Sequence, residues 1–482
     1  MTELAARARD TRKGPARSTD FYPPRVLPPS RTPGALEFLR LIIKDPLLSV
    51  PAEAYEKDVL YRRWPARLAY ACSPEAVRGV LVEQRKQFDR KPDIQRYLLG
   101  RLLGNGILLA EGADWKWQRQ TTNPLFRQAD VLNYVPVMEQ AARHTLAQWR
   151  NDPDGVVPAA GDMVRTTYEV IARTVLISGS EDVTRTTEES SPAYSRAFPW
   201  ALAYGLLRIP QYVPRPGRKT MNQRDARLRA IVSKMLERSE ASHPTDDLLT
   251  RLRQARHPET GRGMSRDQLI DNILTFLLAG HHTTAMALTW TLYVLASLPE
   301  LQEELYAEVA AVVGPGPITR QDIDRFSLIP KVIKETMRLF PPVPGLSRLA
   351  LEDAELVGQR IPAGTIVNIP IYSLHRHHGV WDDAHRFDPE RFAPERERGF
   401  KSCQFLPFGA GPRICSGMAF AMVEATVILA TLIRDVRFEL ASRDFVPTPI
   451  SRVVLVPKEG LPLRVVFRRG GASRAKGQHK AS

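Results

Sequence analysis

The sequence predicts a mainly α protein with a small β-rich lobe, and three observations support that fold class. From Pro33 to about residue 340, apolar residues recur at helical spacing between polar or Pro/Gly loops. After residue 343, short β-like runs bounded by Gly and Pro occupy 355–357, 365–371 and 453–466. The chain has 482 residues, 43% hydrophobic and 25% charged, as in globular proteins with a large core.

The longest predicted element is a helix from residue 265 to residue 299. It contains 28 consecutive residues, 272–299, without Asp, Glu, Lys or Arg, and Ser265 with Gln268 forms a capping box at its start. Its length alone would allow a membrane span, but Gly280 and the histidines and threonines after it would then lie at mid-bilayer. We therefore expect a buried helix that crosses the domain, and no transmembrane anchor.

About half of the net charge of +15 lies at the two ends of the chain. Residues 1–27 and 468–482 are rich in Lys and Arg, so we expect a disordered basic arm and a disordered basic tail. The excess of positive charge in the rest of the chain is modest and is not interleaved with aromatic residues. We therefore expect no nucleic-acid partner.

The cysteines bear on the cellular compartment. Cys72, Cys403 and Cys415 are an odd, widely spaced set, which argues against a disulfide framework and favours a reducing compartment. A transit sequence is an alternative for the basic N-terminus, although Asp10 and Pro15 weaken it. We expect a cytoplasmic protein.

The strongest motif is Phe408-x-x-Gly411-x-Arg413-x-Cys415-x-Gly417, a pattern that chance rarely produces. Glycine allows close backbone approach and positive φ. A cysteine directly before a helix, here predicted from Met418 onward to residue 432, is held as a thiolate by the helix dipole and the free N–H groups. Such a thiolate is a metal ligand or a nucleophile.

This motif resembles the haem-binding loop of the cytochrome P450 superfamily, in particular its soluble, bacterial-type haem-thiolate monooxygenases. The resemblance implies that Cys415 is the axial ligand of haem b, that Phe408 and Gly417 contact the cofactor, and that the thiolate favours O–O cleavage. It also implies a single domain of that fold over residues 28–467, with the long central helix over the haem.

Other segments resemble the family's motifs in the expected order. Glu335-Thr-Met-Arg338 resembles its E-x-x-R motif, and Arg391 would complete a structural ion-pair triad with Glu335 and Arg338. The E-x-x-R spacing alone is uninformative, because it recurs elsewhere in the chain. Residues that would bind the haem propionates by the same resemblance are Trp115, Arg119, Arg348 and Arg413.

Within the long helix, the segment from Gly280 to Thr283 resembles the family's oxygen-activation motif. Gly280 would leave room for O₂, and Thr283 would donate a hydrogen bond to the bound oxygen. The residue before this threonine is usually acidic in the family, whereas here it is His282. With a reference pKa of about 6.5, an imidazole relays protons near neutrality. Packing of His282 within the core is the alternative.

The resemblance implies a monooxygenase that inserts one oxygen atom from O₂ into a hydrophobic small molecule of the fatty acid, terpenoid/steroid or polyketide class. Residues 198–210 would form the roof of the substrate cavity, and 343–346 and 448–450 parts of its walls. Only 67 residues follow Cys415, so we expect electrons from a separate ferredoxin or flavodoxin. Positive charge would attract this donor at Arg119, Arg127, Arg413 and Arg434.

Two alternatives remain open at this point. The departure at His282 is compatible with a peroxide-driven peroxygenase or a non-oxygenating haem-thiolate enzyme. A non-catalytic haem carrier or sensor would keep the haem and carry out no turnover. Adjacent histidines alone do not indicate zinc, since a third ligand at recognisable spacing is missing from the sequence.

Overall fold

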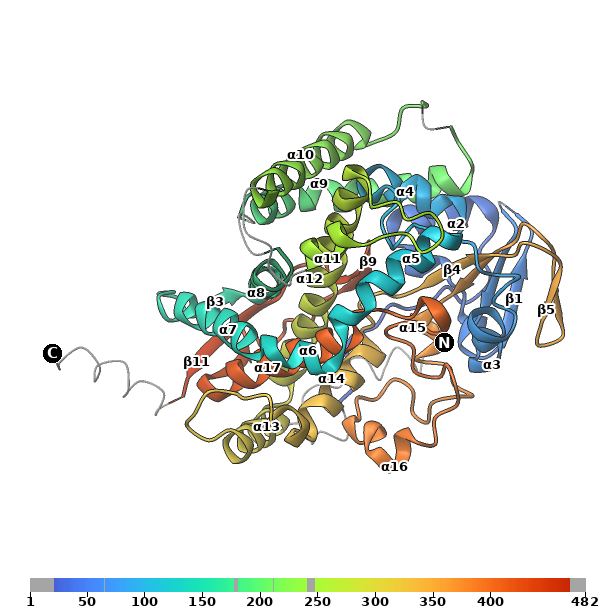
Figure 1. Ribbon diagram of the computed structural model, residues 1–482. Helices are drawn as coiled ribbons and strands as arrows, with labels where there is room; N and C mark the ends of the chain where they lie inside the picture. Colours follow the sequence, from blue (N-terminus) through green and yellow to red (C-terminus); the bar gives the residue numbers. More distant parts are fainter. Residues whose placement is uncertain (1–20, 65, 177–180, 211, 241–247, 469–482) are drawn as a thin grey trace.

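The computed structural model describes residues 21–64, 66–176, 181–210, 212–240 and 248–468. Helices fill most of the molecule and small sheets lie at its sides, so the predicted fold class is confirmed (Figure 1). The helices are α2 (Ala35–Lys44), α3 (Pro74–Arg78), α4 (Asp93–Leu103), α5 (Gly112–Thr122), α6 (Gln128–Val131), α7 (Val135–Arg150), α8 (Ala159–Ile171), α9 (Glu181–Leu206), α10 (Arg218–Glu240), α11 (Leu248–Gln254), α12 (Arg266–Ser297), α13 (Pro299–Val312), α14 (Leu328–Leu339), α15 (Ile371–Leu374), α16 (Pro394–Glu397) and α17 (Met418–Asp435).

Helix α12 passes through the middle of the molecule, between α10 above and α14 below in Figure 1. At ~1.5 Å per residue it is about 50 Å long, and both hydrogen bonds of the predicted capping box between Ser265 and Gln268 are present. It is apolar on most sides because it packs against α8, α10, α14 and α17. Across the described part of the chain, no helix is both long and apolar enough to cross a membrane.

A four-stranded sheet joins an early segment of the chain to one about 300 residues later. Its order is β1 (Val59–Arg62), β2 (Leu68–Ala71), β7 (Ile366–Ile369) and β4 (Leu346–Leu349), with β2 parallel to β7 and Leu68 opposite Ile366. The sequence pattern predicted helices in this early region and missed β1 and β2. Both strands have four residues, and β2 is buried throughout, so neither shows the alternation that reveals a strand.

The remaining strands form three small sheets. β3 (Val156–Pro158), β11 (Pro462–Phe467) and β8 (Val436–Leu440) pair in that order, while β5 (Ala354–Leu356) pairs with β6 (Gln359–Ile361) and β9 (Pro449–Ser451) with β10 (Leu455–Pro457). The predicted run 453–466 is divided into β10 and β11, because Gly460 turns the chain at a φ of +73°.

The predicted disordered arm, 1–27, and tail, 468–482, each include residues that belong to the folded domain. Residues 1–20 and 469–482 lie outside the described residues. Phe21, however, accepts a backbone hydrogen bond from Phe387 and packs on its ring, and the N–H of Val26 donates to the Tyr372 hydroxyl. Arg468 forms a two-fold ion pair with Glu303. The assignment of 21–27 and of Arg468 to disordered segments was therefore wrong.

The predicted triad is present at the end of α14. The side chains of Glu335 and Arg338 are each 0% exposed, and Arg338 donates two hydrogen bonds of 2.7 Å to the Glu335 carboxylate. Arg391 Nε lies 3.5 Å from Glu335 Oε1. Arg338 also donates to the carbonyl oxygen of His375, whose Nε2 accepts the N–H of Leu406 at 2.8 Å. The triad thus fixes the chain that leads into the Cys415 loop.

We expect Arg338→Met to lower the free energy of unfolding by about 3–5 kcal/mol, because Glu335 would keep a buried charge without its partner. Urea denaturation followed by circular dichroism measures this loss. The double variant Glu335→Gln/Arg338→Met removes the lone charge and should recover part of the stability. A double variant no more stable than the single one would contradict this account of the triad.

Candidate active site

The loop from Phe408 to Gly417 is held by its backbone. The N–H of Cys415 donates to the carbonyl oxygen of Phe408 at 2.9 Å. Gly411 has a φ of +69°, and a Cβ there would lie 2.1 Å from the carbonyl oxygen of Leu81. Only glycine fits this close approach, which explains its place in the motif.

The thiol of Cys415 faces a large cavity, directly before α17. Burial raises the pKa of Cys415, while the Gly417 N–H and the Arg119 guanidinium oppose this increase. Among the protein's own groups, desolvation is the larger of these effects. A bound metal ion supplies the positive charge that deprotonates a coordinating thiol.

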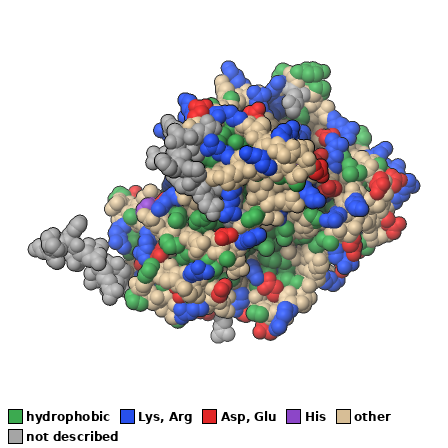
Figure 2. Space-filling view, viewed as in Figure 1, with side chains coloured by type: hydrophobic (Ala, Val, Ile, Leu, Met, Phe, Trp, Pro, Cys, Tyr) green, Lys and Arg blue, Asp and Glu red, His purple; other side chains and the backbone are tan. Residues whose placement is uncertain are grey.

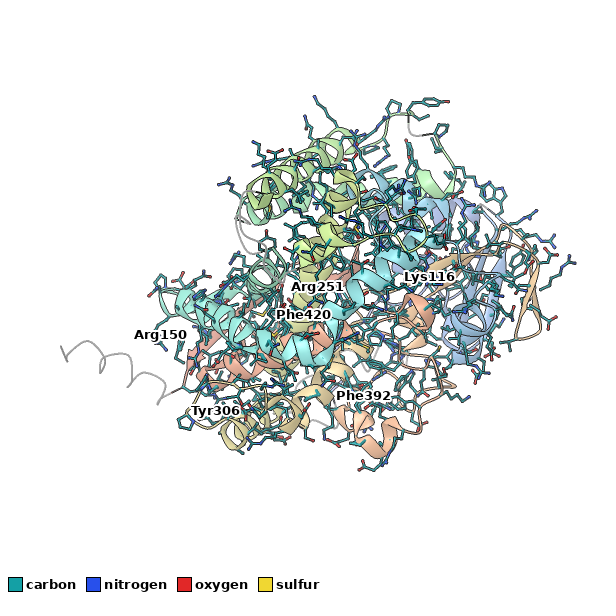
Figure 3. The ribbon with its side chains drawn as sticks, viewed as in Figure 1. Lys116, Arg150, Arg251, Tyr306, Phe392 and Phe420 are labelled. Atoms are coloured by element: carbon teal, nitrogen blue, oxygen red, sulfur yellow. The ribbon has the colours of Figure 1, made fainter. Side chains whose placement is uncertain are left out.

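The cavity has a volume of about 990 Å³ and brings together all the predicted haem-binding and oxygen-activation residues. The ring of Phe420 in α17, near the centre of Figure 3, also lines it and packs edge-on against Phe126. The predicted roof, 198–210, contributes three side chains of α9 to the cavity lining: Phe198, Leu202 and Leu206. The lining residues that the sequence predicted are Trp115, Arg119, Gly280, His282, Thr283, Arg348, Phe408, Arg413, Cys415 and Gly417.

One part of the cavity wall carries several cations. Arg413 stacks its guanidinium on the ring of Trp115, 4.5 Å from the ring centroid, and its Nη2 has no hydrogen-bond partner. Burial, with the charge of Arg413, lowers the pKa of Arg348 to about 10. Arg119 Nε is also buried without a partner. Among the described residues that line the cavity there is no Asp or Glu, so this wall suits an anionic ligand.

Lys91 joins this cluster, although it belongs to no motif that could have predicted it. It precedes α4, lines the cavity, and donates to the carbonyl oxygen of Leu108. Burial, together with the charges of Arg413 and Arg348, lowers its pKa to about 7. An anion nearby would restore the charged form. With Cys415 on the same cavity, these cations fit a haem, whose two propionates need such partners.

The oxygen-activation segment of α12 lines the same cavity. Thr283 Oγ1 donates to the carbonyl oxygen of Ala279 at 2.9 Å. Burial, with the charges of His281 and Arg224, lowers the pKa of His282 to about 3, so its imidazole is neutral at pH 7. A Cβ at Gly280 would lie 3.1 Å from the Ile171 side chain, so this glycine also allows α8 to pack closely.

Two other predicted positions differ from expectation. Arg434 is largely buried and binds Glu139 at 3.1 Å and the Gly316 carbonyl oxygen at 2.8 Å, so it is not a surface cation. Residues 448–450 do not line the cavity, whereas 451–454 do. Of the four arginines proposed for an electron donor, Arg119 and Arg413 face the cavity, and Arg127 is exposed.

Comparison with known proteins decides the family. The sequence profile of the cytochrome P450 family matches residues 49–464. The chain is a cytochrome P450. It is 31% identical over 393 residues to cyclooctat-9-en-7-ol 5-monooxygenase of Streptomyces melanosporofaciens, covering 80% of this chain and 83% of that protein. It is 29% identical over 427 residues to pentalenene oxygenase of Streptomyces avermitilis, covering 86% and 91%. As a P450 it is a haem-thiolate monooxygenase that uses O₂, a hydrophobic substrate and a redox partner.

We expect Arg348→Gln and Arg413→Gln in this P450 to lose haem about tenfold faster, because each removes a charge-assisted bond to a propionate. Transfer of haem to apomyoglobin measures the rate. Lys116→Gln is the matched control, since Lys116 lies exposed on α5, the helix of Trp115 (Figure 3). Equal rates of haem loss in all three variants would contradict the assignment of Arg348 and Arg413 to the haem propionates.

Proposed function

We propose that this P450 hydroxylates a cyclic terpenoid. Both Streptomyces relatives carry names of cyclic terpenoid oxidation, and each aligns with most of this chain. One observation carries the proposal: Cys415 and the apolar side chains of α9 and α4 line the same cavity. An apolar wall of this kind binds a hydrocarbon skeleton through burial of its surface and excludes water from it.

The proposed roles follow from the positions of the side chains. The haem, when bound, supplies the activation of O₂, with Cys415 as its thiolate ligand. Lys91, Arg119, Arg348 and Arg413 would hold its propionates and so fix its plane. Thr283 would turn its hydroxyl from Ala279 toward the cavity to donate a hydrogen bond there. The neutral imidazole of His282 would offer one N–H donor and one acceptor nitrogen.

A separate ferredoxin or flavodoxin would deliver the electrons. A surface depression of about 540 Å³ lies beside Ser416, next to Cys415, and both Arg127 and Arg119 line it. An acidic partner seated there would come close to the thiolate ligand. On the face in Figure 2, basic and acidic side chains are interspersed, so the attraction would be local to this depression. The three cysteines are unpaired, which supports the proposal of a cytoplasmic, reducing location.

The proposed function is tested by turnover with a panel of cyclic diterpenes and sesquiterpenes. We expect isotopically labelled O₂ to place one labelled oxygen atom in the product when reductase and either ferredoxin or flavodoxin are present, and reduction to slow as salt increases. The parallel arm supplies hydrogen peroxide alone. Product formed as fast with peroxide alone, or no oxygenated terpenoid in the presence of a competent donor, would overturn the proposal.

A further inference from the structure

One buried carboxylate joins three elements of the fold. Asp271 of α12 is 4% exposed, and its two side-chain oxygens have different partners. Oδ1 accepts a hydrogen bond from Nη1 of Arg229 in α10 at 2.6 Å, and Oδ2 accepts the backbone N–H of Asn105 at 2.7 Å. Arg229 also donates to the carbonyl oxygen of Leu102 near the end of α4. Helices α4, α10 and α12, which pack against one another in the upper part of Figure 1, are thus connected at a single acid.

The loop that follows α4, residues 104–110, lies directly on α12 at this point, and we call it the wall loop. Gly104 has a φ of +46°, and a Cβ there would overlap the Asp271 carboxylate. The N–H of Ile107 donates to Oδ1 of Asn272 at 2.9 Å. Two consecutive side chains of α12 therefore hold the backbone of the wall loop, and glycine makes room for the first of them.

The wall loop and α10 both face the large cavity. The wall loop contributes the side chains of Ile107, Leu108 and Leu109 to the cavity lining, and α10 contributes Arg224. Helix α10 also packs on α9, which carries the apolar roof. Asp271 itself does not line the cavity. It can therefore act on a ligand only through the two walls that it joins.

Other groups hold the far end of the wall loop. Arg96 donates to the carbonyl oxygen of Leu109, and Arg413 to that of Ala110, each at 3.0 Å. Loss of the Asp271 contacts would therefore shift the near half of the loop without releasing its far end. We expect such a change to alter ligand binding in a protein that remains folded.

We propose that Asp271 is a positioning residue for the substrate: it binds Arg229 and the wall loop at once, so that α10 and the wall loop close over the ligand as one unit. Charge-assisted hydrogen bonds are about twice as strong as neutral ones, and both bonds to this carboxylate are of that kind. A ligand that buries apolar surface against both walls would lose contact area if the walls moved independently. This inference rests on the proposed function of the same cavity and identifies a residue outside it that serves substrate binding.

The test measures how two probes bind to the holoenzyme. Imidazole and clotrimazole, an imidazole that bears three aromatic rings, both coordinate the haem iron through nitrogen and shift its Soret band. Only clotrimazole carries apolar rings for the two walls to bury. We expect Asp271→Asn and Arg229→Gln each to weaken clotrimazole about fivefold and imidazole by less than about twofold.

Hydrogen exchange of the holoenzyme, followed by mass spectrometry, provides an independent arm. Arg229→Gln changes α10, yet peptides that cover the wall loop should exchange about tenfold faster in this variant, because the two walls share one acid. Arg229→Gln also carries the binding test where Asp271→Asn does not fold.

Glu237→Gln is the matched control. Glu237 is exposed on α10 and pairs with Arg266 of α12 at 2.7 Å, so this variant removes an ion pair between the same two helices without touching the wall loop. It should change neither readout. An unchanged ratio of the two dissociation constants in Asp271→Asn, or unchanged exchange of the wall loop in Arg229→Gln, would overturn the proposal. Failure of the terpenoid assignment is distinguishable, since neither readout requires a terpenoid or turnover.

Discussion

The position of the Cys415 loop is the constraint on which the rest of the site depends. Gly411 lies against the carbonyl oxygen of Leu81, and the Phe408 carbonyl accepts the N–H of Cys415, so the loop cannot move without losing both contacts. The Glu335–Arg338 pair fixes the preceding chain from the other side. The sulfur is thereby presented to the cavity by rigid backbone, and a ligand with a preorganised position binds metal without ordering a loop.

Charge is distributed unevenly around the cavity: one wall is cationic and the roof is apolar. The two regions suit two different ligands. The cations near Trp115 are partly desolvated and lack enough acceptors, as the unpartnered Nη2 of Arg413 and the low pKa of Lys91 show. The roof, by contrast, is apolar along α9. A cofactor with acidic edges and a hydrophobic substrate therefore have separate places, and the neutral His282 stands at the α12 wall that borders both.

Local, spaced motifs could be predicted from the sequence, and features created by distant contacts could not. The capping box at Ser265, the triad and the cavity-facing side chains follow from short patterns, and the structure brings each set together. Strands β1 and β2 depend on β7, about 300 residues later, and Lys91 belongs to no motif. Burial, which sequence spacing does not reveal, also affects Cys415 and His282 through their pKa values and places Arg434 against Glu139 instead of at the surface.

The absorption spectrum of the reduced, carbon monoxide-bound protein shows whether the Cys415 thiolate ligates the haem iron. We expect a haem-containing protein with the Soret band of a thiolate-ligated iron, and loss of that band in Cys415→Ser. Cys403→Ser, which changes a half-buried thiol outside the cavity lining, should leave the band unchanged. A protein that binds no haem after supplementation, or a thiolate band that survives in Cys415→Ser, would contradict it.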